Sequence, residues 1–283
     1  MSATHPHEGE TMDEFSGRVA VITGGASGIG AALARAFAAR GSKIVLADLD
    51  EAALGRMERE LTGLSVPVLA VRTDVTQRAS VAALADATWK HFGAAHIVCN
   101  NAGIALVGEL ARAPHDDWEY TMNVDFWGVV HGVEAFVPRL LEQRQGGHVL
   151  NTASMAGLVG MQWLGIYCAA KFAVVGMTEA LHRELKPHGI GASVLCPMIV
   201  ATNITANSQR MRPGAPPAPA SSSEGQPPEG AMQGGTVTAE SVAARVVRGI
   251  ERKDLYVLTH PEQREILRRR AARLDAVFES WEA

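Results

Sequence analysis

The sequence predicts an α/β fold in which one parallel β-sheet is covered by helices on both faces. Short, strongly apolar segments alternate with longer segments of helical periodicity, and the apolar segments lack the polar alternation of a half-exposed sheet. Strands that alternate with helices form right-handed crossover units, and these make neighbouring strands parallel. A chain of 283 residues with 47% hydrophobic residues can bury a core of this size.

Seven apolar, β-rich segments are predicted as strands: Arg18–Thr23, Lys43–Ala47, Val66–Val71, His96–Cys99, His148–Asn151, Gly191–Cys196 and Leu255–Leu258. Helical periodicity predicts helices at Ala31–Arg40, Ala79–Phe92, Asp116–Gln143, Gly165–Lys186, Thr238–Ile250 and from Pro261 onward. We expect Pro138 to kink the third of these helices, and Pro187 with Gly189 to end the fourth.

Two segments depart from this pattern. Residues 1–14 lack periodicity, which predicts a flexible N-terminal extension before a single domain over residues 15–283. Inside that domain, about residues 207–236 are dense in Pro, Gly and Ser, a composition that cannot build a packed core. We interpret this segment either as a lid over bound substrate or as an insertion without a catalytic role.

Composition and charge argue against several classes of protein. A formal net charge of -4 disfavours nucleic acid as a partner. The polar, acidic N-terminus is unlike a signal peptide, and no apolar run is long enough to span a membrane. Cys99, Cys168 and Cys196 lack metal-ligand spacing, and the ten histidines are scattered, so we expect no metal site. These features predict a cytoplasmic protein with no membrane partner.

A glycine-rich turn joins the first predicted strand to the helix that follows it. Gly24, Gly28 and Gly30 have the spacing Gly-x-x-x-Gly-x-Gly. Glycines permit a tight turn and let the backbone approach a pyrophosphate, which the helix N-terminus then stabilises. This placement predicts a Rossmann-type, doubly wound dinucleotide-binding domain. The predicted cofactor contacts in the turn are Gly24, Ser27, Gly28, Ile29 and Gly30.

The choice of nucleotide depends on Asp48, which ends the second predicted strand. A carboxylate about 20 residues after the glycine loop can bind the ribose hydroxyls of NAD, and it would repel the additional phosphate of NADP. Leu49 and Asp50 follow it, and no Arg or Lys lies in the glycine loop or directly after Asp48. The residues therefore favour NAD, with an NADP-dependent reductase as the alternative.

Tyr167 and Lys171 are candidate reacting groups. Residues four apart share a helix face, so the phenol and the ammonium can occupy one site. A nearby cation favours the phenolate and lowers the pKa of a tyrosine, which makes proton exchange possible near neutral pH. Ser154 follows a predicted strand at the carboxyl edge of the sheet, where open α/β sheets bind ligands, and it can hydrogen-bond a substrate oxygen.

Together these motifs resemble the compact form of the short-chain dehydrogenase/reductase family. The resemblance covers about Gly17 to Thr202 and is weaker in the tail. The matching positions are the glycine loop, Asp74-Val75, Asn100-Asn101-Ala102-Gly103, Asn123, Ser154, Tyr167 and Lys171. One departure is Met198, which stands where the family commonly has a glycine after the sixth strand.

The resemblance implies a role for each matched residue. Tyr167 would be the general acid/base, Ser154 would hold the substrate oxygen, and Lys171 would bind the nicotinamide ribose. Asn123 would hold a water that links Lys171 to solvent, and Asp74 would hydrogen-bond the adenine. The other implied cofactor contacts are Val75, Asn101, Ala102, Gly103, Pro197, Ile199 and Thr202.

The implied activity is hydride transfer between NAD and a secondary alcohol/ketone pair. Largely apolar residues are expected to line the substrate pocket, which favours a hydrophobic substrate: Ala105, Leu106, Met155, Ala156, Met161, Gln162, Trp163 and Met198. The alternatives are an NADP-dependent carbonyl reductase, an epimerase or dehydratase, and a non-catalytic nucleotide-binding regulator. By analogy with the family, the long helices that carry Asn123 and Tyr167 would pair subunits in a homodimer or homotetramer.

Overall fold

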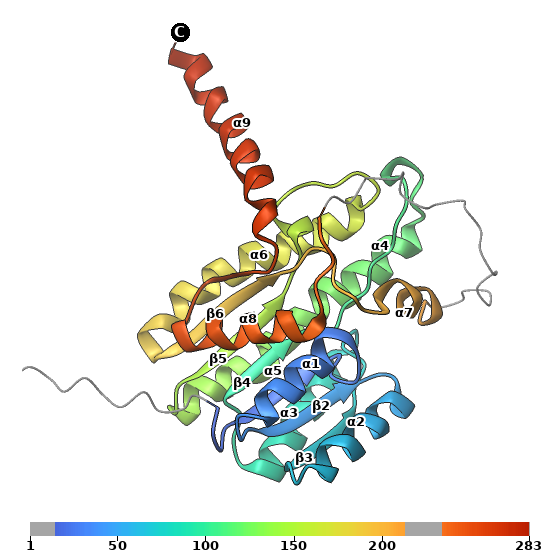
Figure 1. Ribbon diagram of the computed structural model, residues 1–283, viewed down its shortest axis with the longest axis vertical. Helices are drawn as coiled ribbons and strands as arrows, with labels where there is room; N and C mark the ends of the chain where they lie inside the picture. Colours follow the sequence, from blue (N-terminus) through green and yellow to red (C-terminus); the bar gives the residue numbers. More distant parts are fainter. Residues whose placement is uncertain (1–14, 213–233, 283) are drawn as a thin grey trace, which may run out of the picture.

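Seven parallel strands form one sheet in the order β3-β2-β1-β4-β5-β6-β7 (Figure 1). The computed structural model describes residues 15–212 and 234–282. The predicted N-terminal extension and residues 213–233 of the Pro/Gly-rich segment lie outside the described residues. The strands are β1 (Val19–Thr23), β2 (Lys43–Asp48), β3 (Val68–Arg72), β4 (Ile97–Asn100), β5 (Gly147–Thr152), β6 (Ile190–Cys196) and β7 (Tyr256–Leu258). The predicted fold class is confirmed.

Helices cover both faces of this sheet, because neighbouring residues of each strand enter different cores. Ala20 and Ile22 of β1 pack in one core with α1 (Gly28–Ala38), α2 (Glu51–Gly63) and α8 (Ala239–Arg252). Val19 and Val21 enter the core on the opposite face. That second layer contains α3 (Arg78–Phe92), α5 (Gly128–Gln143) and α6 (Gly165–Leu185). Burial on both faces explains the continuous apolar runs of the strands.

The segment predicted as one helix over Asp116–Gln143 has three parts, so that prediction is wrong in the middle. The chain forms α4 (His115–Met122), then a π-helical segment, η2 (Asn123–Trp127), and then α5, which contains Pro138. A π-helical turn holds more residues than an α-helical turn, and such turns are frequent at functional sites. Here the turn contains the buried residue Asp125.

The sheet has a topological switch point between β1 and β4. The chain leaves β1 to build β2 and β3 on one side, and it then returns to place β4 on the other side. A crevice opens at the carboxyl ends of the strands at such a point. Thr23 at the end of β1 lies at the floor of this crevice. The Oγ1 of Thr23 accepts hydrogen bonds from Asn101 N at 2.9 Å and from Ala102 N at 3.1 Å.

The C-terminal part of the chain rejoins the body beside β6. Val200 and Val237 form an isolated parallel bridge, so the chain before the Pro/Gly-rich segment lies beside the chain that follows it. Helix α7 (Ile204–Arg210) includes the first residues predicted for that segment, and α9 (Arg264–Glu282) ends the described chain. Figure 1 shows α9 projecting away from the body.

Candidate active site

The glycine loop makes a turn that side chains would block. Gly24 has φ +63°, and a Cβ there would lie 2.9 Å from the Cα of Ala102. A Cβ on Gly30 would lie 2.0 Å from the carbonyl oxygen of Gly24. The loop therefore packs backbone against backbone and leads directly into the N-terminus of α1, which begins at Gly28. This is a cradle suited to a pyrophosphate.

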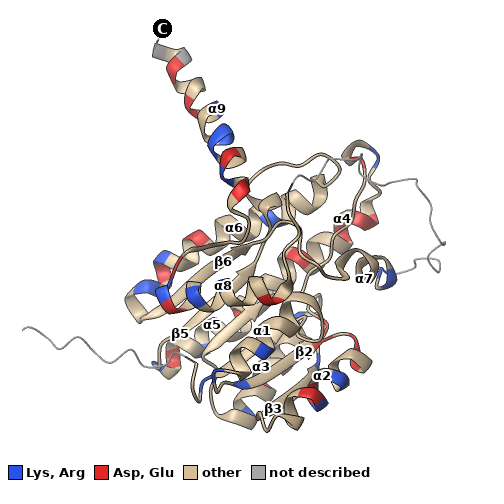
Figure 2. Cartoon of the chain, viewed as in Figure 1, with Lys and Arg blue, Asp and Glu red and all other residues tan. Residues whose placement is uncertain are grey.

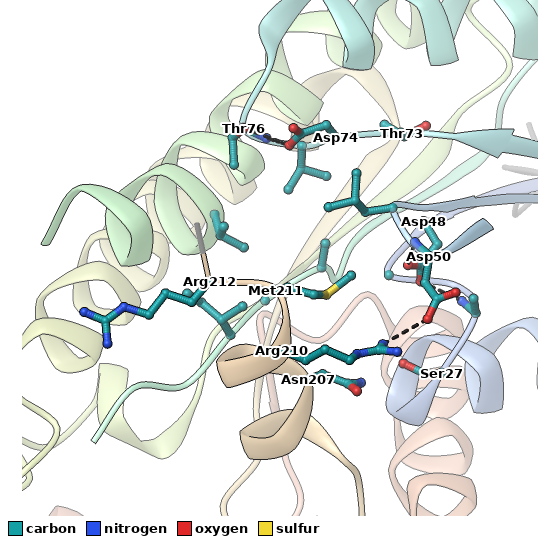
Figure 3. A pocket seen from close by; sticks show the side chains of 18 of the residues that line it. Ser27, Asp48, Asp50, Thr73, Asp74, Thr76, Asn207, Arg210, Met211 and Arg212 are labelled. Atoms are coloured by element: carbon teal, nitrogen blue, oxygen red, sulfur yellow. Dashed lines mark hydrogen bonds and ion pairs between the residues drawn. The ribbon is translucent and has the colours of Figure 1, made fainter. Parts of the chain in front are cut away.

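Asp48 lies beside this cradle, at the end of β2. Its Oδ2 accepts a hydrogen bond from Ala26 N at 3.1 Å, and its Oδ1 accepts one from Asp50 N at 3.0 Å. These bonds fix the carboxylate at the wall of a cavity of about 790 Å³ (Figure 3). Asp74 lines the same cavity, and its Oδ1 accepts hydrogen bonds from Thr76 N and Thr76 Oγ1. The predicted residues Ser27, Val75, Ala102 and Gly103 also line it.

The structure also brings three arginines to this cavity, Arg56, Arg210 and Arg212, which reasoning from neighbours in the chain missed. Arg210, at the end of α7, reaches across to Asp50, and the Nη2 to Oδ2 distance is 2.9 Å (Figure 3). Arg56 of α2 also lines the cavity. Arg56 could have been recognised from the sequence, because it lies one to two helical turns after Asp50, in α2. Arg210 lies 160 positions from Asp50, so only the tertiary fold relates them.

Ser154, Tyr167 and Lys171 line a second cavity of about 410 Å³, which shares Gly24, Ser27, Ala102 and Gly103 with the first. Lys171 is 2% exposed, and its Nζ donates a hydrogen bond to the carbonyl oxygen of Thr152 at 3.1 Å. The same Nζ lies 5.5 Å from the centre of the Tyr167 ring. The structure thus brings the predicted serine, tyrosine and lysine together.

Asn123 does not join this group. Its side chain is exposed and lines the larger cavity, beside Tyr120 and Val124. The residue that faces Lys171 is Asp125, whose Oδ1 lies 3.4 Å from Nζ and accepts a hydrogen bond from Ile104 N at 2.9 Å. Asp125 is thus the acidic side chain in contact with Lys171, while the predicted water link from Asn123 to Lys171 stays a prediction.

The sequence offered a signal for the buried Asp125, which reasoning from the asparagine missed. Asp125 is the acidic residue in an otherwise apolar stretch, Val124-Asp125-Phe126-Trp127. Acidic side chains are rarely buried unless they have a partner. The π-helical geometry of η2 turns Asp125, rather than Asn123, toward Lys171.

The charges around Tyr167 differ from the sequence expectation. Burial raises the pKa of the phenol, and the Asp125 carboxylate raises it further, while a hydrogen bond with Ser154 acts in the opposite direction. Lys171 was expected to lower this pKa, but Asp125 lies against its ammonium and offsets its charge. In the protein by itself, Tyr167 holds its proton more firmly than a free tyrosine does.

The chain after β6 closes the second cavity. Pro197, Met198, Ile199 and Thr202 all line it, as does Ile29 from the glycine loop. A Cβ on Gly28 would lie 3.1 Å from Cγ2 of Thr202, so this chain segment touches the cradle. The side chain of Asn101 donates to the carbonyl oxygen of Thr23 at 3.0 Å and ties the ends of β1 and β4 together.

Only part of the predicted substrate wall is correct. Ala105, Met161 and Met198 line the second cavity. Leu106 and Trp163 instead line a separate cavity of about 450 Å³, Met155 and Ala156 are buried in the core, and Gln162 is exposed. The sequence missed five apolar residues of the wall: Val107, Ala153, Leu164, Val200 and Ile204. The revised wall remains mainly apolar.

Among residues 15–212 and 234–282, no group of three or more His, Cys, Asp or Glu side chains could hold a metal ion. Within the same ranges, no helix is both long and apolar enough to cross a membrane. All three cysteines are buried and free.

A glycine cradle, an acid after β2 and a Tyr-x-x-x-Lys pair define a dinucleotide-binding oxidoreductase of the Rossmann type. The model of the short chain dehydrogenase family matches residues 18–213. The chain belongs to this family.

Relatives of known name and solved structure share most of its length. A Mycobacterium tuberculosis protein, SadH, is 41% identical over 199 residues, which cover 70% of this chain and 72% of SadH. The CLA biosynthesis dehydrogenase/reductase of Lactiplantibacillus plantarum is 33% identical, with 93% of this chain and 95% of that protein covered. A short-chain dehydrogenase/reductase from Burkholderia phymatum, solved in complex with NAD, is 41% identical with a TM-score of 0.86, and 93% of this chain and 96% of that chain are covered.

Proposed function

We propose that this chain is an NAD-dependent oxidoreductase that interconverts a hydrophobic secondary alcohol and its ketone. The observation that carries the proposal is the meeting of Ser154, Tyr167 and Lys171 in an apolar cavity continuous with the glycine cradle. An alcohol in that cavity would place its oxygen beside the phenol and its carbon toward the cradle.

The residues of the cradle fit a dinucleotide. Gly24 and Gly30 permit the tight turn that leads into the N-terminus of α1, where a pyrophosphate would bind. Asp48 and Asp74 line the first cavity, where they would bind the adenosine ribose and the adenine. Lys171 would bind the nicotinamide ribose with donors that Thr152 leaves free. When bound, NAD supplies the hydride acceptor and NADH the hydride donor, so the protein has to orient the substrate and move one proton.

Tyr167 would move that proton. In alcohol oxidation its phenolate oxygen takes the hydroxyl proton as the hydride leaves carbon, and in ketone reduction the phenol returns the proton to oxygen. Ser154 would hold the substrate oxygen by a hydrogen bond. Its Oγ donates a hydrogen bond to the carbonyl oxygen of Pro197 at 3.3 Å, which orients the hydroxyl.

Asp125 would position Lys171. The carboxylate and the Thr152 carbonyl hold the ammonium between them, and both charged side chains are buried. Because this pair is nearly neutral overall, the positive charge of oxidised nicotinamide becomes the main charge available to favour the phenolate.

The preference for NAD over NADP is proposed from the charges at the other cavity. Asp48 and Asp50 present two carboxylates at the end of β2, and the nearest ion pair of Arg210 is with Asp50. A further phosphate at the adenosine ribose would meet Asp48 first. The relative from Burkholderia phymatum was solved with NAD, which supports the same choice. Arg56 and Arg210 are the residues through which an NADP-dependent reductase, the alternative, would work.

A direct assay tests the proposal. The purified protein is mixed with NAD or NADP and a panel of apolar secondary alcohols, and the absorbance of reduced nicotinamide is followed while the ketone is identified chromatographically. We expect turnover with NAD and at least tenfold lower kcat/KM with NADP. If the protein binds NADH but oxidises no alcohol and reduces no ketone, the proposed activity is wrong.

A further inference from the structure

Helix α9 presents an apolar face that the described chain leaves uncovered. Residues 271–279 are all exposed, so more than two turns of the helix stand clear of the body (Figure 1). Leu274, Phe278 and Trp281 are 54%, 61% and 76% exposed. Their spacing of four and three residues places them on one side of the helix. Most helical stability in proteins comes from packing of an apolar face, so a surface that covers these residues would stabilise α9.

The base of α9 is fixed to the body beside the second cavity. The guanidinium of Arg270 lies 5.5 Å from the centre of the Phe172 ring on α6. Before the helix, His260 Nε2 lies within hydrogen-bond distance of the carbonyl oxygens of Ile199 and Gly235. The helix therefore leaves the body in a defined direction, and its exposed face is presented at a fixed place.

The charges of α9 are segregated along its length. Arg264, Arg268, Arg269, Arg270 and Arg273 lie in the first half, with Glu265 as the one acid. The second half carries Asp275, Glu279 and Glu282 and no Lys or Arg. Figure 2 shows acidic residues toward the free end of the helix. Among the described residues, Arg268 and Arg273 have no ion-pair partner.

We propose that α9 pairs antiparallel with α9 of a second copy of this chain. A two-fold axis near Arg273 would generate this arrangement. The basic half of each helix would then lie beside the acidic half of the other helix. The apolar side chains in the second half of one helix would then cover Leu267 and Ala271 of the other helix. Leu267 and Ala271 lie on the same side of α9 as Leu274. Parallel pairing would instead place acid beside acid and arginine beside arginine.

The same charge pattern argues against a lipid surface as the partner of the apolar face of α9. Helices that lie on membranes carry Lys and Arg around their apolar face, because the headgroups are often anionic. Here the exposed apolar residues Leu274, Phe278 and Trp281 are interspersed with Asp275 and Glu279. A second copy supplies the arginines that these acids lack.

The assembly state of the full chain tests whether the apolar face of α9 joins two copies. Light scattering with size-exclusion chromatography would compare the wild type with the Leu274→Asp/Phe278→Asp variant and with Ala272→Asp/Ala276→Asp, a control on the opposite side of the helix. We expect the first variant to lose one step of association, from tetramer to dimer or from dimer to monomer, and the control to keep it. An unchanged assembly in the first variant overturns the proposal.

Cross-linking tests the direction of pairing. The three native cysteines are buried, so a cysteine introduced on α9 reports on that helix alone. With the axis near Arg273, two copies of Ala271→Cys would lie about 6 Å apart along the axis and two copies of Trp281→Cys about 24 Å. A short thiol cross-linker should join the first pair, and neither the second nor the Ala272→Cys control.

Two outcomes of these experiments contradict the proposal. Equal cross-linking of Trp281→Cys would indicate parallel helices. Binding of the wild type to anionic phospholipid vesicles, lost in Leu274→Asp/Phe278→Asp without a change of assembly, would assign the face to lipid. Neither experiment depends on enzymatic activity.

Discussion

The two cavities of the site handle charge in opposite ways. At the first cavity, Asp48 and Asp50 are only half-buried and Arg210 is exposed, so water screens their interactions. At the second, Asp125 and Lys171 are almost fully buried, at 0% and 2% exposure. In the proposed function, the first cavity would therefore select a nucleotide by modest electrostatic effects. The second cavity depends on the Asp125–Lys171 ion pair, and removal of one partner would greatly destabilise the fold.

The largest effect is expected for Lys171→Met. This variant leaves Asp125 buried without its cation, which should cost about 3 kcal/mol or more of stability. It also removes the group proposed to hold the nicotinamide ribose, so NAD-dependent turnover should fall by about 100-fold or more. Thermal unfolding and kcat/KM measure the two effects.

The Lys171→Met/Asp125→Asn double variant separates the effect on stability from the effect on turnover. With both charges gone, the unfolding temperature should recover toward that of the wild type while turnover stays low. Recovery of turnover in the double variant would refute the proposed role of the lysine.

A shift in pH dependence is expected for Asp125→Asn. The Asp125 carboxylate raises the pKa of Tyr167, and oxidation requires the phenolate, so the rate should rise with pH. Removing the carboxylate lowers that pKa, and the acidic limb of the kcat/KM profile for oxidation should move down by about one pH unit. Asp86→Asn, which removes an exposed carboxylate paired with Arg139, is the matched control. Superimposable profiles would show that Asp125 does not act on Tyr167.

A smaller effect is expected for Asp48→Ala at the first cavity. In the proposed binding mode, loss of this carboxylate would remove a hydrogen-bond acceptor for the adenosine ribose and a charge that repels the additional phosphate of NADP. The ratio of kcat/KM for NAD to that for NADP should therefore fall by about tenfold, which corresponds to about 1.4 kcal/mol. Glu51→Ala removes an exposed acid three positions away that pairs with Arg72, and it should leave the ratio unchanged.

The smallest effect is expected for Arg210→Ala. The Arg210 side chain is 61% exposed, and exposed ion pairs contribute about 0–1 kcal/mol. The unfolding free energy should change by less than about 0.5 kcal/mol, and KM for NAD by less than about threefold. A tenfold rise in KM for NAD, absent from Arg72→Ala, would show that Arg210 contributes more to cofactor binding than its ion pair does.

The sequence was sufficient where function depends on neighbours in the chain. Buried parallel strands require continuous apolar runs, and the glycine cradle requires a strand before it and a helix after it, so both leave local patterns. The pairing of Tyr167 with Lys171 follows from the helical period alone. These parts of the fold and the site could be predicted.

The sequence was insufficient where function depends on tertiary contacts or on irregular backbone. An α-helical period cannot reveal the π-helical segment η2, so the contact of Asp125 with Lys171 was not predicted. Arg210 reaches Asp50 from a distant helix, and Leu106 and Trp163 turn into another cavity. Such side-chain directions are set by packing, which no short segment encodes.

Tyr167→Phe tests the central claim most directly. The variant keeps the ring and removes the oxygen that is proposed to take and return the substrate proton. With the best alcohol of the panel and saturating NAD, we expect turnover to fall by about 100-fold or more, while the dissociation constant for NADH stays within about threefold of the wild type. Turnover equal to that of the wild type would contradict the account.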